Sequence, residues 1–130
     1  MPKTIEEIRE FFSQDVFATE MGARIESVGD MSAVVSLEVT PHHKNAMGAL
    51  MGGVSFTLAD FAFAVAANHE KVTAVSMDSS ISFLGTLKGS RLIARAVCIK
   101  DGMRSCFFRV DVTDDTGAAI AAVNITGFKL

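Results

Sequence analysis

From Asn45 to Asn68 this chain carries only one charged side chain, that of Asp60, whereas charged and apolar residues alternate at short intervals elsewhere. Residues 54–67 are apolar on almost every side of a helix, which is typical of a buried helix rather than one on the surface. We therefore predict a helix from Gly52 or Gly53 to Asn68. A carboxylate buried in such a helix is costly unless it is partnered or has a chemical role, so Asp60 is the first candidate functional residue.

In the rest of the chain the apolar residues tend to recur at every second position, which predicts β-strands with one face toward a core. In the segment 104–113, the side chains at 106, 108, 110 and 112 share an apolar face. The breaks between the last four segments contain Gly, Asp and Ser, which are typical of turns. The predicted strands are Ala23–Val28, Ser32–Thr40, Thr73–Leu84, Arg91–Lys100, Arg104–Thr113 and Ala118–Lys129.

The N-terminal region has the pattern of a short helix. Thr4 and Glu7 have the spacing of a capping box and precede apolar residues at helical spacing. This predicts an amphipathic helix from Ile5 to Gln14. We expect Asp15–Gly22 to form a compact link and Pro41–Met51 to form a loop.

The predicted order is one helix, two strands, the buried helix and four strands. Strands and helices do not alternate regularly, which argues against a doubly wound parallel sheet. A helix that is apolar on all sides must be wrapped, and a curved antiparallel sheet is the wrapper that the strands can supply. We predict an α+β fold with residues 1–130 in a single domain, a length sufficient for a substantial core.

Composition excludes several classes of function. The formal net charge of -3 argues against general nucleic-acid binding, which needs a basic face. Neither Cys98 and Cys106 nor His42 and His43 have the spacing of a metal site, so we expect no metal, and the cysteines are expected to pack in the core. The N-terminus has no apolar signal core. The segment from Asn45 to Asn68 is too short and too interrupted by glycine to span a membrane, and it contains Asp60. We therefore expect a cytoplasmic protein.

Several short motifs match one known family. An Asn, a short Gly-containing loop, two glycines and a helix with Leu-Ala-Asp stand at Asn45, Gly48, Gly52, Gly53 and Leu58-Ala59-Asp60. Downstream, residues 74–78 contain a strand serine at Ser76, and residues 83–89 begin with Phe and end with Gly. This combination resembles the hotdog-fold acyl-CoA thioesterases, most closely the phenylacetyl-CoA thioesterase-like (PaaI-like) group. The resemblance implies a hotdog fold, in which a curved antiparallel β-sheet wraps a long central helix, and hydrolysis of an acyl-CoA without a cofactor.

This chain departs from the family pattern at two positions. The family usually has His before the two glycines, whereas this chain has Met51, whose side chain forms no useful hydrogen bond. The usual Pro in the segment 83–89 is also missing. In the family that His is generally secondary to the acid and the Gly N–H, so Met51 affects the expected rate and substrate fit more than the fold.

The candidate chemistry combines Asp60 with the predicted start of the helix. The backbone N–H of Gly52, assisted by the helix dipole, would polarise a thioester carbonyl, and Asp60 would act as nucleophile or general base. The two residues are about 12 Å apart along one helix. One carbonyl therefore cannot contact both in a single chain, and a two-fold dimer would bring Asp60 to Gly52 of a second subunit. The resemblance implies the same shared site, and often a tetramer built from two such dimers.

Two further residues are candidates for the catalytic centre. Ser76 is expected to position water, although strand alternation places it with Asp78 on a face where it could simply be exposed. Bulges often re-aim such residues, which keeps the catalytic role open. Asn45 is expected to orient the acid or the thioester, or alternatively to stabilise its own loop.

The predicted substrate contacts rest on position alone. Met51 and Gly53 flank Gly52, and Phe56 and Phe63 follow at helical spacing on the side of Asp60. For the two phenylalanines, core packing is the alternative. Lys88 and Arg104 lie near predicted turns, where they could meet coenzyme A phosphates or remain solvated surface charges.

Three functions compete. An acyl-CoA thioesterase is the main prediction. A hotdog dehydratase or hydratase would need the His that Met51 replaces. A non-catalytic acyl-CoA-binding protein remains the alternative, because Asp60 could be structural.

Overall fold

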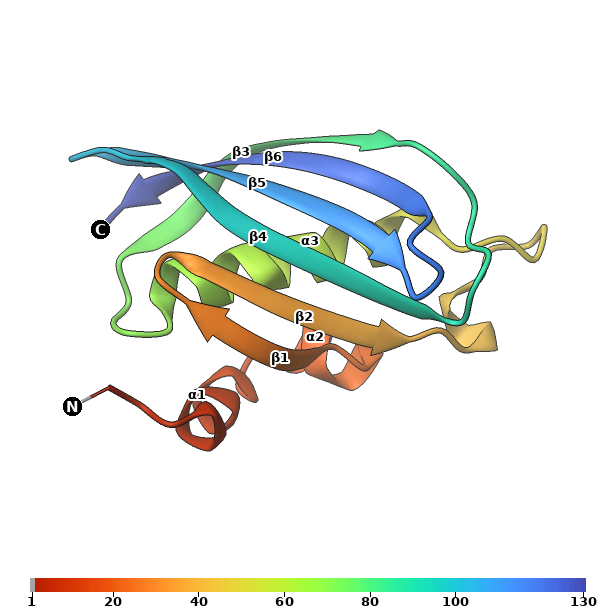
Figure 1. Ribbon diagram of the computed structural model, residues 1–130, viewed down its shortest axis with the longest axis horizontal. Coiled ribbons are helices and arrows are strands. Elements are labelled where there is room, and N and C mark those ends of the chain that lie inside the picture. The colour runs from red at the N-terminus through yellow and green to blue at the C-terminus, as the bar shows by residue number, and fades with distance from the viewer. Residues whose placement is uncertain (1) are drawn as a thin grey trace.

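The computed structural model describes residues 2–130 and folds them into a six-stranded antiparallel sheet with one long helix against it (Figure 1). The elements are α1 (Ile5–Phe12), α2 (Val16–Met21), β1 (Arg24–Gly29), β2 (Ser32–Glu38), the 3₁₀ turn η1 (Pro41–His43), α3 (Gly52–Asn68), β3 (Ala74–Phe83), β4 (Arg91–Asp101), β5 (Ser105–Asp114) and β6 (Ala119–Lys129).

The strand order in the sheet is β1-β2-β4-β5-β6-β3, and every neighbouring pair is antiparallel. The sheet curves along α3, whose axis follows the strands (Figure 1). The predicted α+β architecture, with a curved antiparallel sheet on a long central helix, is confirmed. β3 lies at one edge of the sheet although it follows α3 directly in the chain.

The main core lies between α3 and the inner face of the sheet. Residues from alternate strand positions, such as Val35, Leu92, Val110 and Val123, are fully buried there. Phe63 of α3 packs edge-to-face on Phe108 of β5, with ring centroids 5.1 Å apart. Full burial of each such side chain contributes about 1.5–3 kcal/mol, so packing rather than helix propensity holds α3 in place.

The sheet covers only part of α3, so the predicted wrapping leaves one side of the helix open. Ten α3 residues are buried, but Gly53, Phe56, Thr57, Asp60 and Ala64 remain partly or largely exposed. These residues follow one another at helical spacing and form a continuous strip, called here the open strip of α3. One sheet can cover one side of a helix, and the short α1–α2 segment covers only part of the other side.

The predicted link Asp15–Gly22 contains a helix, α2. Asp15 precedes α2 without a capping hydrogen bond from its side chain within residues 2–130, so the usual sequence signal for a helix start is weak. Gly22 ends α2 with a φ of 115°, a conformation that glycine adopts without strain. The first helix ends at Phe12, two residues earlier than predicted, while the capping box of Thr4 and Glu7 is confirmed.

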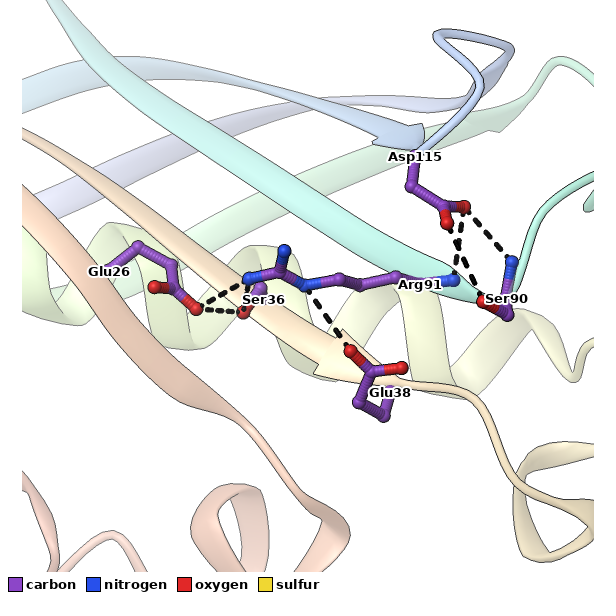
Figure 2. A network of polar contacts seen from close by, with 6 residues as sticks. All are labelled: Glu26, Ser36, Glu38, Ser90, Arg91 and Asp115. Atoms are coloured by element: carbon purple, nitrogen blue, oxygen red, sulfur yellow. Dashed lines mark hydrogen bonds and ion pairs between the residues drawn. The ribbon is translucent and has the colours of Figure 1, made fainter.

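Polar side chains fasten the sheet at the start of β4. Arg91 donates to Glu26 of β1 at 2.7 Å and to the hydroxyl of Ser36 of β2 at 3.1 Å, and Ser36 in turn donates to Glu26 (Figure 2). These bonds, the one from Ser36 first, lower the pKa of Glu26. The backbone N–H of Arg91 also donates to Asp115. This network joins β1, β2 and β4 and belongs to the framework.

Asp114, at the end of β5, fixes the connection between β3 and β4. Its carboxylate is buried and accepts hydrogen bonds from the backbone N–H groups of Lys88 and Gly89 at 2.8 Å. It also accepts bonds from the backbone N–H groups of Thr116 and Ala118 and from the Thr116 hydroxyl. This set of bonds, that from the Thr116 hydroxyl first, holds the pKa of Asp114 far below its ordinary value.

Candidate active site

Asp60 lies in the middle of α3 on its open strip, where its carboxylate is partly buried. It borders a pocket of about 270 Å³ whose other walls include Asp15, Phe17, Phe61 and Ala64. Burial raises the pKa of Asp60, the nearby Ser76 hydroxyl lowers it, and the charge of Asp15 raises it. An acid with a raised pKa beside an apolar pocket is suited to general-base or nucleophilic chemistry.

Ser76 lies on the α3-facing side of β3 because the strand contains a bulge, and it remains exposed there. Ser76 pairs with Gly127, whereas Asp78 pairs with Thr126, so Met77 is an extra residue between them. Residues paired across a sheet point to the same face, and a Cβ on Gly127 would face Phe63 in the core. Strand alternation predicted Ser76 and Asp78 on one face; this is wrong, because the bulge separates them. Ser76 thereby comes close enough to Asp60 to influence its pKa.

The start of α3 forms a second pocket of about 500 Å³. The backbone N–H groups of Gly52 and Gly53 find no acceptor within the described chain, and the Met51 side chain provides no cap there. The first turn of α3 also contains no acidic residue. The positive end of the helix dipole therefore lies at the pocket, with the free N–H of Gly52 among its lining, which suits a carbonyl that develops negative charge.

The two glycines at this helix start have different surroundings. A Cβ on Gly52 would come within 2.7 Å of the Phe83 ring, so Gly52 allows this ring to lie against the helix. A Cβ on Gly53 would meet nothing within 4 Å in the described chain. The space beside Gly53 is therefore the open approach to the helix start, whereas at Gly52 the close neighbour in the protomer is Phe83.

The Asp60 pocket and the Gly52 pocket share no lining residue. Asp60 and Gly52 are eight residues apart in α3, which corresponds to about 12 Å along the helix axis. One protomer thus presents an acid in one place and a polarising helix start in another.

Asn45 lies in the loop before α3 and is engaged in that loop. Its side-chain oxygen accepts hydrogen bonds from the backbone N–H groups of Met47 at 3.0 Å and Ala49 at 3.1 Å. These bonds match the loop-stabilising alternative for Asn45. The side chain holds the turn that precedes Met51 and the helix start.

The other predicted substrate contacts are scattered. Phe63 is 2% exposed and belongs to the core, as its alternative interpretation stated, so it offers no surface to a ligand. Phe56 lies partly exposed on the open strip, and Met51 is 53% exposed at the helix start. Lys88 is exposed in the β3–β4 connection, at the α3-start end of the molecule, while Arg104 lies in the β4–β5 hairpin at the opposite end (Figure 1). Lys88 and Arg104 of one chain therefore cannot bind the same phosphates, because β4 separates them by roughly 30 Å.

Sequence reasoning did not assign most of the residues that border the two pockets, and four of them show why. Ser55 and Phe83 border the Gly52 pocket, and Asp15 and Phe17 border the Asp60 pocket. Ser55 had a detectable signal, since it is a polar residue in the otherwise apolar helix. The positions of the other three depend on β3 and α2 folding back onto α3, which local patterns do not specify.

Two general observations concern ligands. Among residues 2–130, no group of three or more His, Cys, Asp or Glu side chains is arranged to hold a metal ion. No helix in the described chain is long and apolar enough to cross a membrane. His43 and His69 each bond a backbone carbonyl at 2.7 Å, to Met21 and Gly29.

Comparison with known proteins identifies the family of this arrangement. Residues 47–121, more than half of the chain, match the model of the Thioesterase superfamily. Acyl-coenzyme A thioesterase PaaI of Escherichia coli is 30% identical over 111 residues, which cover 85% of this chain and 79% of that protein.

Solved structures give the same result. The phenylacetic acid degradation protein PaaI from Thermus thermophilus, solved as a mutant, superposes with a TM-score of 0.83 and 32% identity, covering 89% of this chain and all of that one. A thioesterase protein from Streptococcus pneumoniae, solved with coenzyme A, superposes with a TM-score of 0.83 and 25% identity, covering 92% of this chain and 96% of that one.

Proposed function

Because the chain belongs to the Thioesterase superfamily, we propose that it hydrolyses an acyl-CoA with Asp60 of one subunit and the Gly52 N–H of a second subunit. As a member of that superfamily it is a thioester hydrolase. The single observation that carries the assignment of residues is the pairing of a partly buried acid with an uncapped helix start on α3. The coenzyme A bound to the Streptococcus pneumoniae protein supports the class of substrate.

In the proposed reaction the thioester carbonyl accepts a hydrogen bond from the helix start. The bond and the helix dipole stabilise the oxyanion that forms when the carbonyl carbon is attacked. As a general base, Asp60 takes a proton from the attacking water. The C–S bond then breaks, and the thiolate of coenzyme A takes up that proton. As a nucleophile, Asp60 would form an acyl anhydride with release of the thiol, and water would then hydrolyse the anhydride.

Ser76 and Asn45 have supporting roles in this proposal. The inward direction of Ser76, produced by the β3 bulge, lets its hydroxyl hold the attacking water beside Asp60. Asn45 shapes the loop that delivers the helix start, and it acts on the reaction through that loop. Gly53 leaves room for the substrate, and Met51 and Phe56 contact it from either side of the opening.

A dimer completes this site. The open strip of α3 carries Phe56 and Asp60 and needs a cover that residues 2–130 of one chain do not supply. β3 is a ten-residue edge strand with Val75, Met77 and Phe83 exposed, an arrangement that favours pairing with another chain. A two-fold axis beside α3 and β3 would cover both features and create two equivalent sites. We further propose that two such dimers form a tetramer, that Lys88 and Arg104 reach coenzyme A from different subunits, and that the protein acts in the cytoplasm.

The test is thiol release from a panel of acyl-CoAs by the wild-type protein and by Asp60→Asn. We expect turnover by the wild type and a loss of at least about 100-fold in the variant, with an unchanged elution volume on size-exclusion chromatography. Equal turnover by both proteins would rule out Asp60.

A non-catalytic acyl-CoA-binding protein is the second candidate. Met51 favours it, because a thioether stands where the thioesterase pattern that this chain resembles has His before the two glycines. Absence of turnover on every acyl-CoA, together with measurable binding, would favour this alternative.

A further inference from the structure

Ser55 is the one buried side chain with an unpaired polar atom within residues 2–130. The residue is 1% exposed, and its hydroxyl forms no hydrogen bond. A buried hydroxyl without a partner lowers the stability of the folded protein, and native proteins retain few such groups. The position of Ser55 therefore requires an explanation.

The hydroxyl of Ser55 also forgoes the bond that a helix normally offers it. A helical serine usually satisfies itself by donating to the carbonyl four residues earlier, which here is that of Met51. That carbonyl instead accepts from the backbone N–H of Val54 at 3.0 Å. The Ser55 hydroxyl therefore bonds neither this carbonyl nor any other acceptor in the described chain.

Ser55 lies at the border of the pocket at the start of α3, where its hydroxyl is buried. It lies three residues after Gly52 on the same face of the helix, and both residues line the pocket of about 500 Å³. Leu50, Phe83 and Leu87 give this pocket apolar walls. The hydroxyl is therefore a buried, unpaired donor at the border of a pocket that also contains Lys44, Thr86 and the free N–H of Gly52.

We infer that Ser55 binds the substrate of the proposed thioesterase by donating a hydrogen bond to a carbonyl oxygen that occupies the Gly52 pocket. This inference rests on the proposed function. An acyl-CoA brings two kinds of carbonyl to such a pocket, that of the thioester and those of the amides in the thiol arm. The shared chemistry is a carbonyl acceptor that satisfies the one buried side-chain donor left unpaired among residues 2–130.

The test is Ser55→Ala, which removes the hydroxyl and leaves the apolar lining intact. We expect a melting temperature about 3 °C higher, because an unpaired buried hydroxyl is lost, and a kcat/KM about tenfold lower, because a bond to the substrate is lost. A hydroxyl with a merely structural role would give a lower melting temperature. Ser27 is an exposed residue of β1 and borders neither pocket, so Ser27→Ala is the control. It should change neither the melting temperature nor kcat/KM.

The kinetic constants distinguish the two carbonyls. A bond to the thioester carbonyl that strengthens as the oxyanion forms predicts a lower kcat with little change in KM. A bond to an arm amide predicts a higher KM. In that case a simple thioester whose thiol part has no amide should be hydrolysed equally by the wild type and by Ser55→Ala.

Two outcomes overturn the inference while leaving the proposed function intact: an unchanged kcat/KM in Ser55→Ala, or a lower melting temperature. If the wild type hydrolyses no acyl-CoA, the proposed function fails and binding decides the role of Ser55. A non-hydrolysable 2-oxoalkyl thioether of coenzyme A retains both kinds of carbonyl. Calorimetry should then give about tenfold weaker binding to Ser55→Ala, and equal affinity would overturn the inference.

Discussion

The polar groups around Asp114 and those around Asp60 are organised in opposite ways. Asp114 accepts five hydrogen bonds, and its pKa is far below the ordinary value. On the open strip of α3, burial raises the pKa of Asp60. Two buried serines show a similar contrast, since Ser36 bonds Glu26 and Arg91 (Figure 2) while Ser55 bonds nothing in the described chain.

The contrast shows that some polar groups of this protein stabilise the fold, whereas others are left without a partner in the protomer. In the first region the donors and acceptors satisfy one another and hold strands together. In the second region a carboxylate, a hydroxyl and two backbone N–H groups are left for something outside the protomer. Groups that bind a substrate must remain unpaired before it arrives, so they reduce the stability of the free protein.

The largest contrast is expected between Asp60→Asn and Asp114→Asn. Asp60→Asn should abolish most turnover and raise the melting temperature at pH 7, because it removes a carboxylate whose charge is disfavoured by burial. Asp114→Asn should lower the melting temperature by several degrees, because an amide cannot accept the same set of bonds. Thermal denaturation and thiol release, measured on both variants, check the pair. If Asp60→Asn and Asp114→Asn lowered the melting temperature equally, Asp60 would stabilise the fold as Asp114 does, and the two regions would not differ.

The pH dependence should separate the same two acids. The lowered pKa of Asp114 means that its contribution to stability is complete above its ordinary value of 3.8 and is lost as the pH falls below it. The raised pKa of Asp60 has the opposite sign, since folding loses stability as the pH rises from 3.8 through the folded-state pKa. Acid denaturation should therefore be less steep in Asp114→Asn than in the wild type. The stability gained by Asp60→Asn should disappear below about pH 3.8.

Ser36→Ala sharpens the comparison of the two serines. Ser36 is 3% exposed and bonds both charged partners, so its loss should lower the free energy of unfolding by about 1–2 kcal/mol. Turnover at saturating substrate should be unchanged, because Ser36 lines neither pocket of the candidate site. Urea denaturation and steady-state kinetics test both parts. A rise in stability would place Ser36 in the same class as Ser55.

The smallest effect on stability is expected at Gly53. Gly53→Ala meets no neighbour within 4 Å and replaces glycine in a helix, so unfolding should cost at most about 1 kcal/mol more. Its kcat/KM should fall all the same, because the added methyl group narrows the open approach to the helix start. Unchanged kinetics in Gly53→Ala would show that the substrate does not pass there.

Local patterns predicted most of the elements and missed the ones that depend on distant partners. The apolar segment that begins at Gly52 predicted both ends of α3 correctly. The segments in which apolar residues alternate predicted all six strands, with bounds correct to within about two residues. The helix α2 was missed because its start has no capping side chain and its packing is tertiary. The bulge in β3 was missed because one extra residue is defined only against β6. That bulge separates Ser76 from Asp78, which matches the re-aimed alternative for Ser76.

The sequence by itself determined that Asp60 lies in an apolar helix and that this helix begins with two glycines, because composition and periodicity are local properties. It also determined, through the rise of a helix, that Asp60 and Gly52 are too far apart to share one carbonyl. The tertiary structure decided which face of α3 stays open, that Ser76 turns inward and that Ser55 is left unpaired. Those properties depend on which strand edges and loops meet the helix, and such contacts join residues far apart in the chain.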